Sequence, residues 1–117
     1  MPEAYGIAFD PFTRLLYVGN RGEYQTVTVV DVDTNNVLDT FAVSREPYML
    51  GVNPNTGHLF VVAGDEVQVR RTADASLVVT LPLPAGAEEG ITVDVVHNRV
   101  YITSRDADAV TVVQDVP

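Results

Sequence analysis

Short apolar runs alternate along the chain with clusters of turn-forming residues. The run "LLYVGN" over residues 15–20 stops at Gly-Asn, and similar runs begin at His58 ("HLFVVAG") and Arg99 ("RVYITS"). These runs are rich in Val, Ile, Thr and Tyr, which favour β-strands. No apolar stripe of helical period continues for the length of a helix without Pro or Gly. The pattern therefore predicts an all-β fold.

The three runs belong to a longer repeat. Tyr17, Phe60 and Tyr101 recur about 40 residues apart, and their surroundings keep the same offsets. The matching segments are GIAFDP, MLGVNP and GITVDV before the aromatic residue, then VTVVD, VQVRR and VTVVQ after it, and finally VLDTFAV and LVVTLPL. Each segment predicts one strand, and a four-stranded unit of this period is typical of a β-propeller blade.

The repeat divides the single domain into three units, 4–46, 47–87 and 88–117. It predicts two complete four-stranded antiparallel blades and three strands of a third, which is a partial β-propeller. Such a blade is packed between neighbours, so both of its faces should be apolar.

The segment from Val37 to Val43 fits this expectation. Val37, Phe41 and Val43 point to one face of the predicted strand, and Leu38 and Ala42 point to the other.

Polar residues mark the predicted turns. Asp10-Pro11 and Asn53-Pro54 end the first strand of their units, and the segment 33–36 links the third and fourth strands. Pro presets φ, and Asn tolerates the left-handed region, so we interpret these residues as folding signals rather than as sites.

The repeated unit resembles the YVTN-repeat β-propellers, which are similar to the WD40 and cytochrome d1-type propellers in fold. The tetrapeptide that names the family is represented here by YVGN from Tyr17, FVVA from Phe60 and YITS from Tyr101. The resemblance covers nearly the whole chain. It implies the fold but no single activity, because the family includes lactonases, surface-layer proteins and domains of redox enzymes.

Three blades are too few to close a ring, since propellers of this family have about six to eight. The two ends of the array should expose apolar faces and unpaired strand edges, which favour association. The sequence therefore predicts that the partner is either the missing part of a longer propeller or the protein itself. Two copies would supply six blades.

The charge of the chain restricts its partners. Sixteen acidic residues outnumber seven basic ones, all of them Arg, so the net charge is −9. Such a surface repels nucleic acid and anionic membranes, whose binding depends on Lys and Arg. The sequence shows no signal peptide and no apolar stretch of about 18 residues that could span a membrane. The compartment stays open, although the family it resembles is often exported.

The composition also excludes several kinds of chemistry. The chain has no Cys and no Lys, which rules out thiolate sites, phosphate-binding loops of the Walker type and Schiff-base catalysis. No Ser lies in a G-x-S-x-G motif. We expect no cofactor.

The candidate ligand face is the one where the loops between second and third strands meet the links between units. Two tyrosines and Glu89 occupy equivalent positions at the start of the innermost strands, where they would line a channel mouth or fill the gap between blades. Acidic residues from three loops join them. The candidate residues are Tyr5, Tyr48, Glu89, Asp65, Glu66, Asp106 and Asp108.

Converging carboxylates suit a hard cation such as Ca²⁺, but no calcium-loop motif is present, and a solvated acidic rim explains them more simply. We predict no metal site. His58 and His97 fall in turns on the opposite face, too few for a zinc site, so we interpret both as ordinary turn histidines.

These observations favour a non-enzymatic binding or scaffold module. The alternative is part of a lactonase-like, metal-dependent hydrolytic propeller. A domain that shelters a redox cofactor is disfavoured, because the chain lacks Cys and Trp and has no His suited to axial ligation on the candidate ligand face.

Overall fold

A computed structural model of the chain describes residues 3–116, and in this range it contains eleven β-strands and no helix. The strands form three antiparallel sheets, each of which follows the chain order. The first sheet consists of β1 (Ala4–Asp10), β2 (Leu15–Asn20), β3 (Thr26–Asp31) and β4 (Asn36–Ala42).

The second sheet has four strands and the third has three. The second consists of β5 (Met49–Asn53), β6 (His58–Val62), β7 (Gly64–Arg71) and β8 (Leu77–Ala87). The third consists of β9 (Ile91–Asp94), β10 (Arg99–Ser104) and β11 (Ala109–Gln114), so β11 is an edge strand within the described range.

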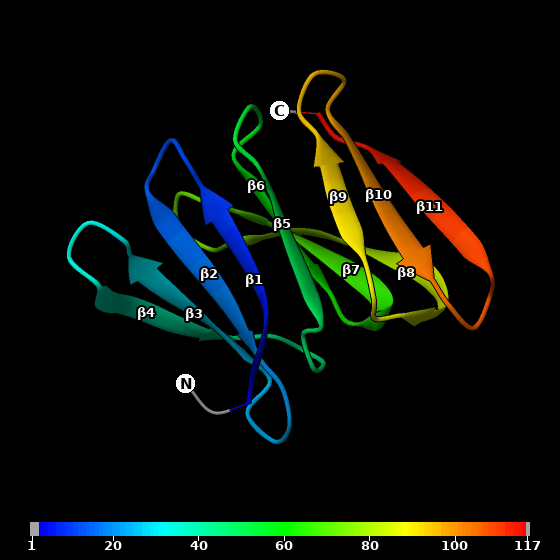
Figure 1. Cartoon of the computed structure of the whole chain (residues 1–117), viewed down its shortest axis with the longest axis horizontal. Helices are drawn as coiled ribbons and strands as arrows, with labels where there is room; N and C mark the ends of the chain where they lie inside the picture. Colours follow the sequence, from blue (N-terminus) through cyan, green and yellow to red (C-terminus); the bar gives the residue numbers. More distant parts are fainter. Residues whose placement is uncertain (1–2, 117) are drawn as a thin grey trace.

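The three sheets stand side by side, with their first strands β1, β5 and β9 adjacent in that order (Figure 1). The β1–β2, β5–β6 and β9–β10 turns lie together at one edge of the array, which we call the turn face. The β2–β3 and β10–β11 loops lie at the opposite edge. Within residues 3–116 no helix has the length and apolarity that crossing a bilayer requires.

An acidic or amide side chain ends the first strand of every sheet by the same hydrogen bond. Asp10 Oδ1 accepts from the Phe12 amide at 2.9 Å, and Asn53 Oδ1 accepts from the Asn55 amide at 3.2 Å. In the third sheet Asp94 Oδ1 accepts from the Val96 amide, although no Pro follows Asp94. These side chains fix the chain reversal locally, as turn-forming Asx residues do.

Two apolar cores join the sheets. The first lies between sheets one and two, and the second lies between sheets two and three. Their central aromatic residues are Tyr17, which is 2% exposed, and Phe60, which is fully buried. The equivalent Tyr101 is only partly buried, because no sheet within the described range packs on its side of sheet three.

The outer strand β4 differs from the sequence expectation. Phe41 packs against the first core and Val43 is buried, but Val37 and Leu38 are 58% and 56% exposed, and Ala42 is exposed too. The sheets approach one another mainly through their inner strands, so most of β4 has no neighbour in the described chain. The expectation that both of its faces are covered was wrong.

Candidate functional site

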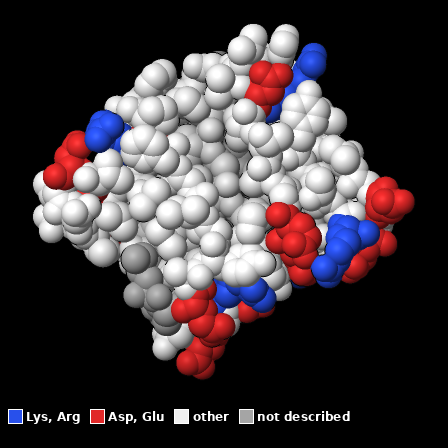
Figure 2. All heavy atoms as spheres, viewed as in Figure 1, with Lys and Arg blue, Asp and Glu red and all other residues white. Residues whose placement is uncertain are grey.

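The loop face is the edge of the molecule that carries the β2–β3, β6–β7 and β10–β11 loops and the links between sheets. Figure 2 shows that acidic groups gather toward this margin, whereas the surface over the inner strands is largely uncharged. The candidate residues proposed from the sequence lie here in three separate clusters.

The first cluster is an arginine held between two tyrosines. Tyr5 lies on β1 and Tyr48 directly precedes β5, and their rings meet edge to face with centroids 6.2 Å apart. The guanidinium carbon of Arg21 lies 4.4 Å from the Tyr5 ring centroid and 4.5 Å from that of Tyr48. Cation–π attraction stabilises this arrangement. We call it the Tyr–Arg stack.

Glu46 supports the Tyr–Arg stack from the link between sheets one and two. One of its oxygens accepts a hydrogen bond from the Gly22 amide at 2.6 Å, and the other accepts one from the Tyr48 hydroxyl at 3.4 Å. Partial burial, followed by the nearby Glu88 and Glu46 carboxylates, raises the pKa of Tyr48. Its hydroxyl therefore stays protonated and can donate.

The second cluster pairs acids with Arg45. The guanidinium lies 3.2 Å from Asp65 Oδ1 and 3.0 Å from Glu66 Oε1. Ser44 donates to the other Glu66 oxygen at 3.0 Å and accepts from Gln68 at 2.6 Å. Both Glu66 oxygens and Asp65 Oδ1 are thus engaged by protein donors.

An open depression of about 290 Å³ lies between the first two clusters. Ser44, Arg45, Glu46 and Tyr48 line it, together with Gln25, Ala63, Gly64 and Glu88. It offers hydrogen-bond donors and acceptors beside the exposed side of a tyrosine.

The third cluster surrounds Arg105. Its guanidinium lies 2.9 Å from Glu89 Oε1 and 3.7 Å from Asp106 Oδ1. Asp108 does not join this ion pair, but it lines an open depression of about 540 Å³ together with Glu89 and Arg105. Both partners of the closer pair are about half exposed or more, so the pair contributes little to stability.

The acids of the loop face therefore do not converge on one point. Asp65 and Glu66 pair with Arg45, Glu89 and Asp106 pair with Arg105, and Asp108 pairs with neither arginine. Within residues 3–116 no group of three or more His, Cys, Asp or Glu is arranged to hold a metal ion. The structure brings Tyr5 and Tyr48 together and keeps both apart from Glu89, whose partner is Arg105. Sequence reasoning missed Arg21, because its position in a loop does not reveal which rings it contacts.

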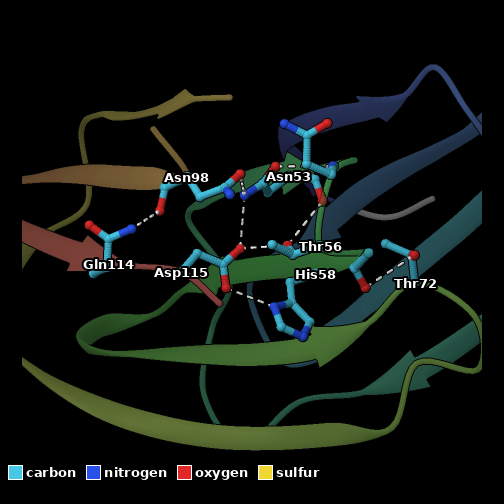
Figure 3. A network of polar contacts seen from close by, with 9 residues as sticks. Asn53, Thr56, His58, Thr72, Asn98, Gln114 and Asp115 are labelled. Carbon is cyan, nitrogen blue, oxygen red and sulfur yellow. Dashed lines mark hydrogen bonds and ion pairs between the residues drawn. The ribbon is translucent and has the colours of Figure 1, made fainter. Parts of the chain in front are cut away.

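A second polar site lies on the turn face, at the junction of sheets two and three (Figure 3). Asp115 Oδ2 accepts from Asn53 at 3.0 Å and from Thr56 at 2.6 Å, and Asp115 Oδ1 lies 2.7 Å from His58 Nδ1. Asn53 also donates to Asn98 at 3.1 Å. We call these five residues the junction network.

His58 is therefore not the ordinary turn histidine that we predicted. It begins β6, is 8% exposed, and pairs with a buried carboxylate. Its separation from Asp115 by 57 positions hid this pairing in the sequence. His97 does lie in an exposed turn, where its hydrogen bond lowers the pKa of Asp94.

Comparison with known proteins supports the architecture. No family model matches the chain, and no curated protein matches its sequence. Among solved structures, the chain is similar to hydrazine synthase from Kuenenia stuttgartiensis, with a TM-score of 0.77 and 23% identity. The match covers 87% of this chain but only 29% of that protein's chain. At this identity the likeness shows the fold alone.

The fold class predicted from the repeat is confirmed. Over residues 3–116 the chain is an all-β partial propeller with two complete antiparallel blades and three strands of another. Membership in the YVTN family is not confirmed.

Proposed function

We propose that the chain is a non-enzymatic binding module of the YVTN-repeat type, whose loop face contacts a polar partner such as a peptide segment. The observation that carries this proposal is the Tyr–Arg stack beside the 290 Å³ depression. Tyrosine and arginine, together with tryptophan, are enriched among the residues that carry most of the binding energy at interfaces. Tyr5 lies on β1 and Tyr48 directly precedes β5, so both rings are anchored at the sheets and little ordering is needed on binding.

The state of the carboxylates supports recognition over catalysis. Glu66 and Asp65 are bound by Arg45, and Glu89 is bound by Arg105. A metal-dependent hydrolase needs carboxylates that are free to ligate an ion, which wants six or more oxygens in the case of Ca²⁺. The lactonase-like alternative would therefore require both arginines to move away.

A cation titration separates the two functions. We expect Ca²⁺, Mg²⁺ and Zn²⁺ to leave the melting temperature of the chain unchanged, because the paired acids form no ligand set. An ion held by Asp65, Glu66, Glu89, Asp106 or Asp108 would instead stabilise the fold by about 2.7 kcal/mol at 100 times its Kd. Such a stabilisation, lost in Asp65→Asn or Glu89→Gln, would favour the hydrolytic alternative.

Binding is tested with a random peptide library displayed on phage. Selection against the chain should enrich one consensus, and synthetic peptides of that consensus should lose at least about tenfold in affinity for Tyr48→Ala. Leu38→Ala, on the exposed face of β4, is the matched control and should bind normally. Failure to enrich any consensus, or peptides that bind Tyr48→Ala and wild type equally, would contradict the proposal.

A further inference from the structure

The same apolar interface joins the sheets twice. On one side, each sheet supplies an aromatic residue from its second strand and two valines from its third, which we call the donor face. The donor faces are Tyr17, Val27 and Val29 in sheet one and Phe60, Val67 and Val69 in sheet two. None of these six side chains is more than 7% exposed.

The opposite side of the interface is equally regular. The next sheet supplies two apolar residues from its first strand and two from its second, which we call the receiver face. The receiver faces are Leu50, Val52, Leu59 and Val61 in sheet two and Ile91, Val93, Val100 and Ile102 in sheet three.

Sheet three presents a further donor face with nothing upon it within the described range. Tyr101, Val110 and Val112 occupy the equivalent positions, and Tyr101 pairs with Val112 across the strands as Tyr17 pairs with Val29. Val110 and Val112 are 61% and 54% exposed, although β-branched apolar residues at these positions are buried in the other two sheets.

Sheet one presents the matching receiver face. Ile7 pairs with Val18 and Phe9 pairs with Leu16, in the register by which Leu50 pairs with Val61 and Val52 with Leu59. Ile7 and Phe9 are 61% and 42% exposed. One chain thus carries both halves of an interface that it has already used twice.

The rim of the interface carries a matching pair as well. Arg21, which follows β2 directly, reaches from sheet one to the Tyr48 ring of sheet two. Arg105 follows β10 in the same way, and its side chain is 67% exposed. Tyr5, the equivalent of Tyr48, is 49% exposed on sheet one.

We propose that the donor face of sheet three in one copy of this chain packs on the receiver face of sheet one in a second copy. The contact continues the internal interface, with Arg105 meeting Tyr5 of the second copy as Arg21 meets Tyr48. It is a heterologous, head-to-tail contact, which a closed ring of copies satisfies at every position. It buries the large exposed apolar residues at both ends of the array. The contact uses Tyr5 and Arg105, neither of which lines the 290 Å³ depression, so peptide binding in that depression does not depend on it.

Two charged substitutions test the direction of the contact. Val112→Asp places a charge in the donor face, and Phe9→Asp places one in the receiver face. Leu38→Asp, on an equally exposed apolar position of β4, is the control. Circular dichroism shows whether each variant folds. If Val112→Asp or Phe9→Asp does not fold, Val110→Asp and Ile7→Asp replace them as the donor-face and receiver-face variants. Masses are measured by analytical ultracentrifugation.

We expect wild type and Leu38→Asp to assemble, and each face variant to sediment as the 12.7 kDa monomer. An equal mixture of Val112→Asp and Phe9→Asp should form a dimer and nothing larger, because one intact donor face and one intact receiver face remain. A monomeric mixture overturns the proposal. So does assembly of either variant alone, which would show a different contact, such as edge pairing of β11. A monomeric wild type also overturns the proposal. The two faces would then be contact surfaces for further blades of a longer protein.

Discussion

Asp115 is the acceptor at the centre of the junction network between sheets two and three. Its carboxylate is 6% exposed and satisfies Asn53, Thr56 and His58 at once. Buried polar groups are costly when they lose their partners, so the network is stabilising only while it is complete.

Asp115→Ala should therefore lower the free energy of unfolding by at least ~2 kcal/mol, because three polar partners lose an acceptor inside the protein. Denaturant unfolding measures the loss. His97→Ala is the control, since it breaks a histidine–aspartate contact of nearly the same length in an exposed turn and should cost much less. Equal losses in the two variants would contradict the structural role of the junction network.

Tyr17 makes the stability of the fold depend on pH in the alkaline range. Burial, with a smaller contribution from the Asp10 carboxylate, raises the pKa of Tyr17 to about 12, above the ordinary value of 10.0. The neutral phenol is favoured in the folded state. Its stabilising contribution is complete below the unfolded pKa and is lost as the pH rises from about 10 to about 12.

Tyr17→Phe should flatten this part of the stability–pH profile. Its loss at neutral pH should be small, because the hydroxyl makes only one long hydrogen bond, 3.4 Å to the Thr72 carbonyl. Unfolding by urea at several alkaline pH values measures the profile. The same slope in wild type and variant would show that Tyr17 does not titrate with unfolding.

At the scale of strands, the sequence contains much of what is needed. Strand type and order could be predicted from three repeated features. These are the aromatic residue of each second strand, the Asx residue that ends each first strand and the valine pair of each third strand. They are predictive because local turn chemistry and two-residue alternation act over a few positions. Exposure could not be predicted this way: Leu38 looks like a core residue, but it is 56% exposed because no sheet within the described range covers it.

The candidate sites were less predictable than the strands. Tyr5 and Tyr48 were found because they occupy equivalent repeat positions. The distribution of acids between Arg45 and Arg105, and the pairing of His58 with Asp115, depend on how loops from distant units meet. No local sequence pattern shows which of these distant side chains come into contact.

The backbone of β1 at Gly6 lies close to the backbone of Tyr48 and Met49, which offers a test of how sheets one and two pack. A Cβ atom on Gly6 would overlap the Tyr48 carbonyl oxygen and lie 3.1 Å from Met49 Cα, so backbone would have to move. Gly6→Ala should cost about 1–3 kcal/mol. Gly51→Ala is the comparison, because the nearest atoms there are the ends of the Ile91 and Val93 side chains, which can shift. A larger loss for Gly51→Ala would mean that β1 and β5 are not packed this closely.

For the molecule as a whole, one interface explains both the internal packing and the exposed ends. Each sheet offers an aromatic residue and two valines to the next, and the last sheet offers them to solvent. Repeat proteins gain stability from such nearest-neighbour contacts. Covering an exposed terminal face with a second copy would therefore add one more stabilising contact of the same kind. The contact takes up Tyr5 and Arg105 at the rim of the loop face, whereas the 290 Å³ depression beside Tyr48 stays free for recognition.

The most direct test of this account is the mass of the wild-type chain in solution, measured by light scattering on a sizing column over a wide range of concentrations. We predict a mass that is a multiple of the 12.7 kDa chain and that approaches the monomer only on dilution. A folded monomer at every concentration would contradict the account, because the exposed donor and receiver faces would then not recognise each other.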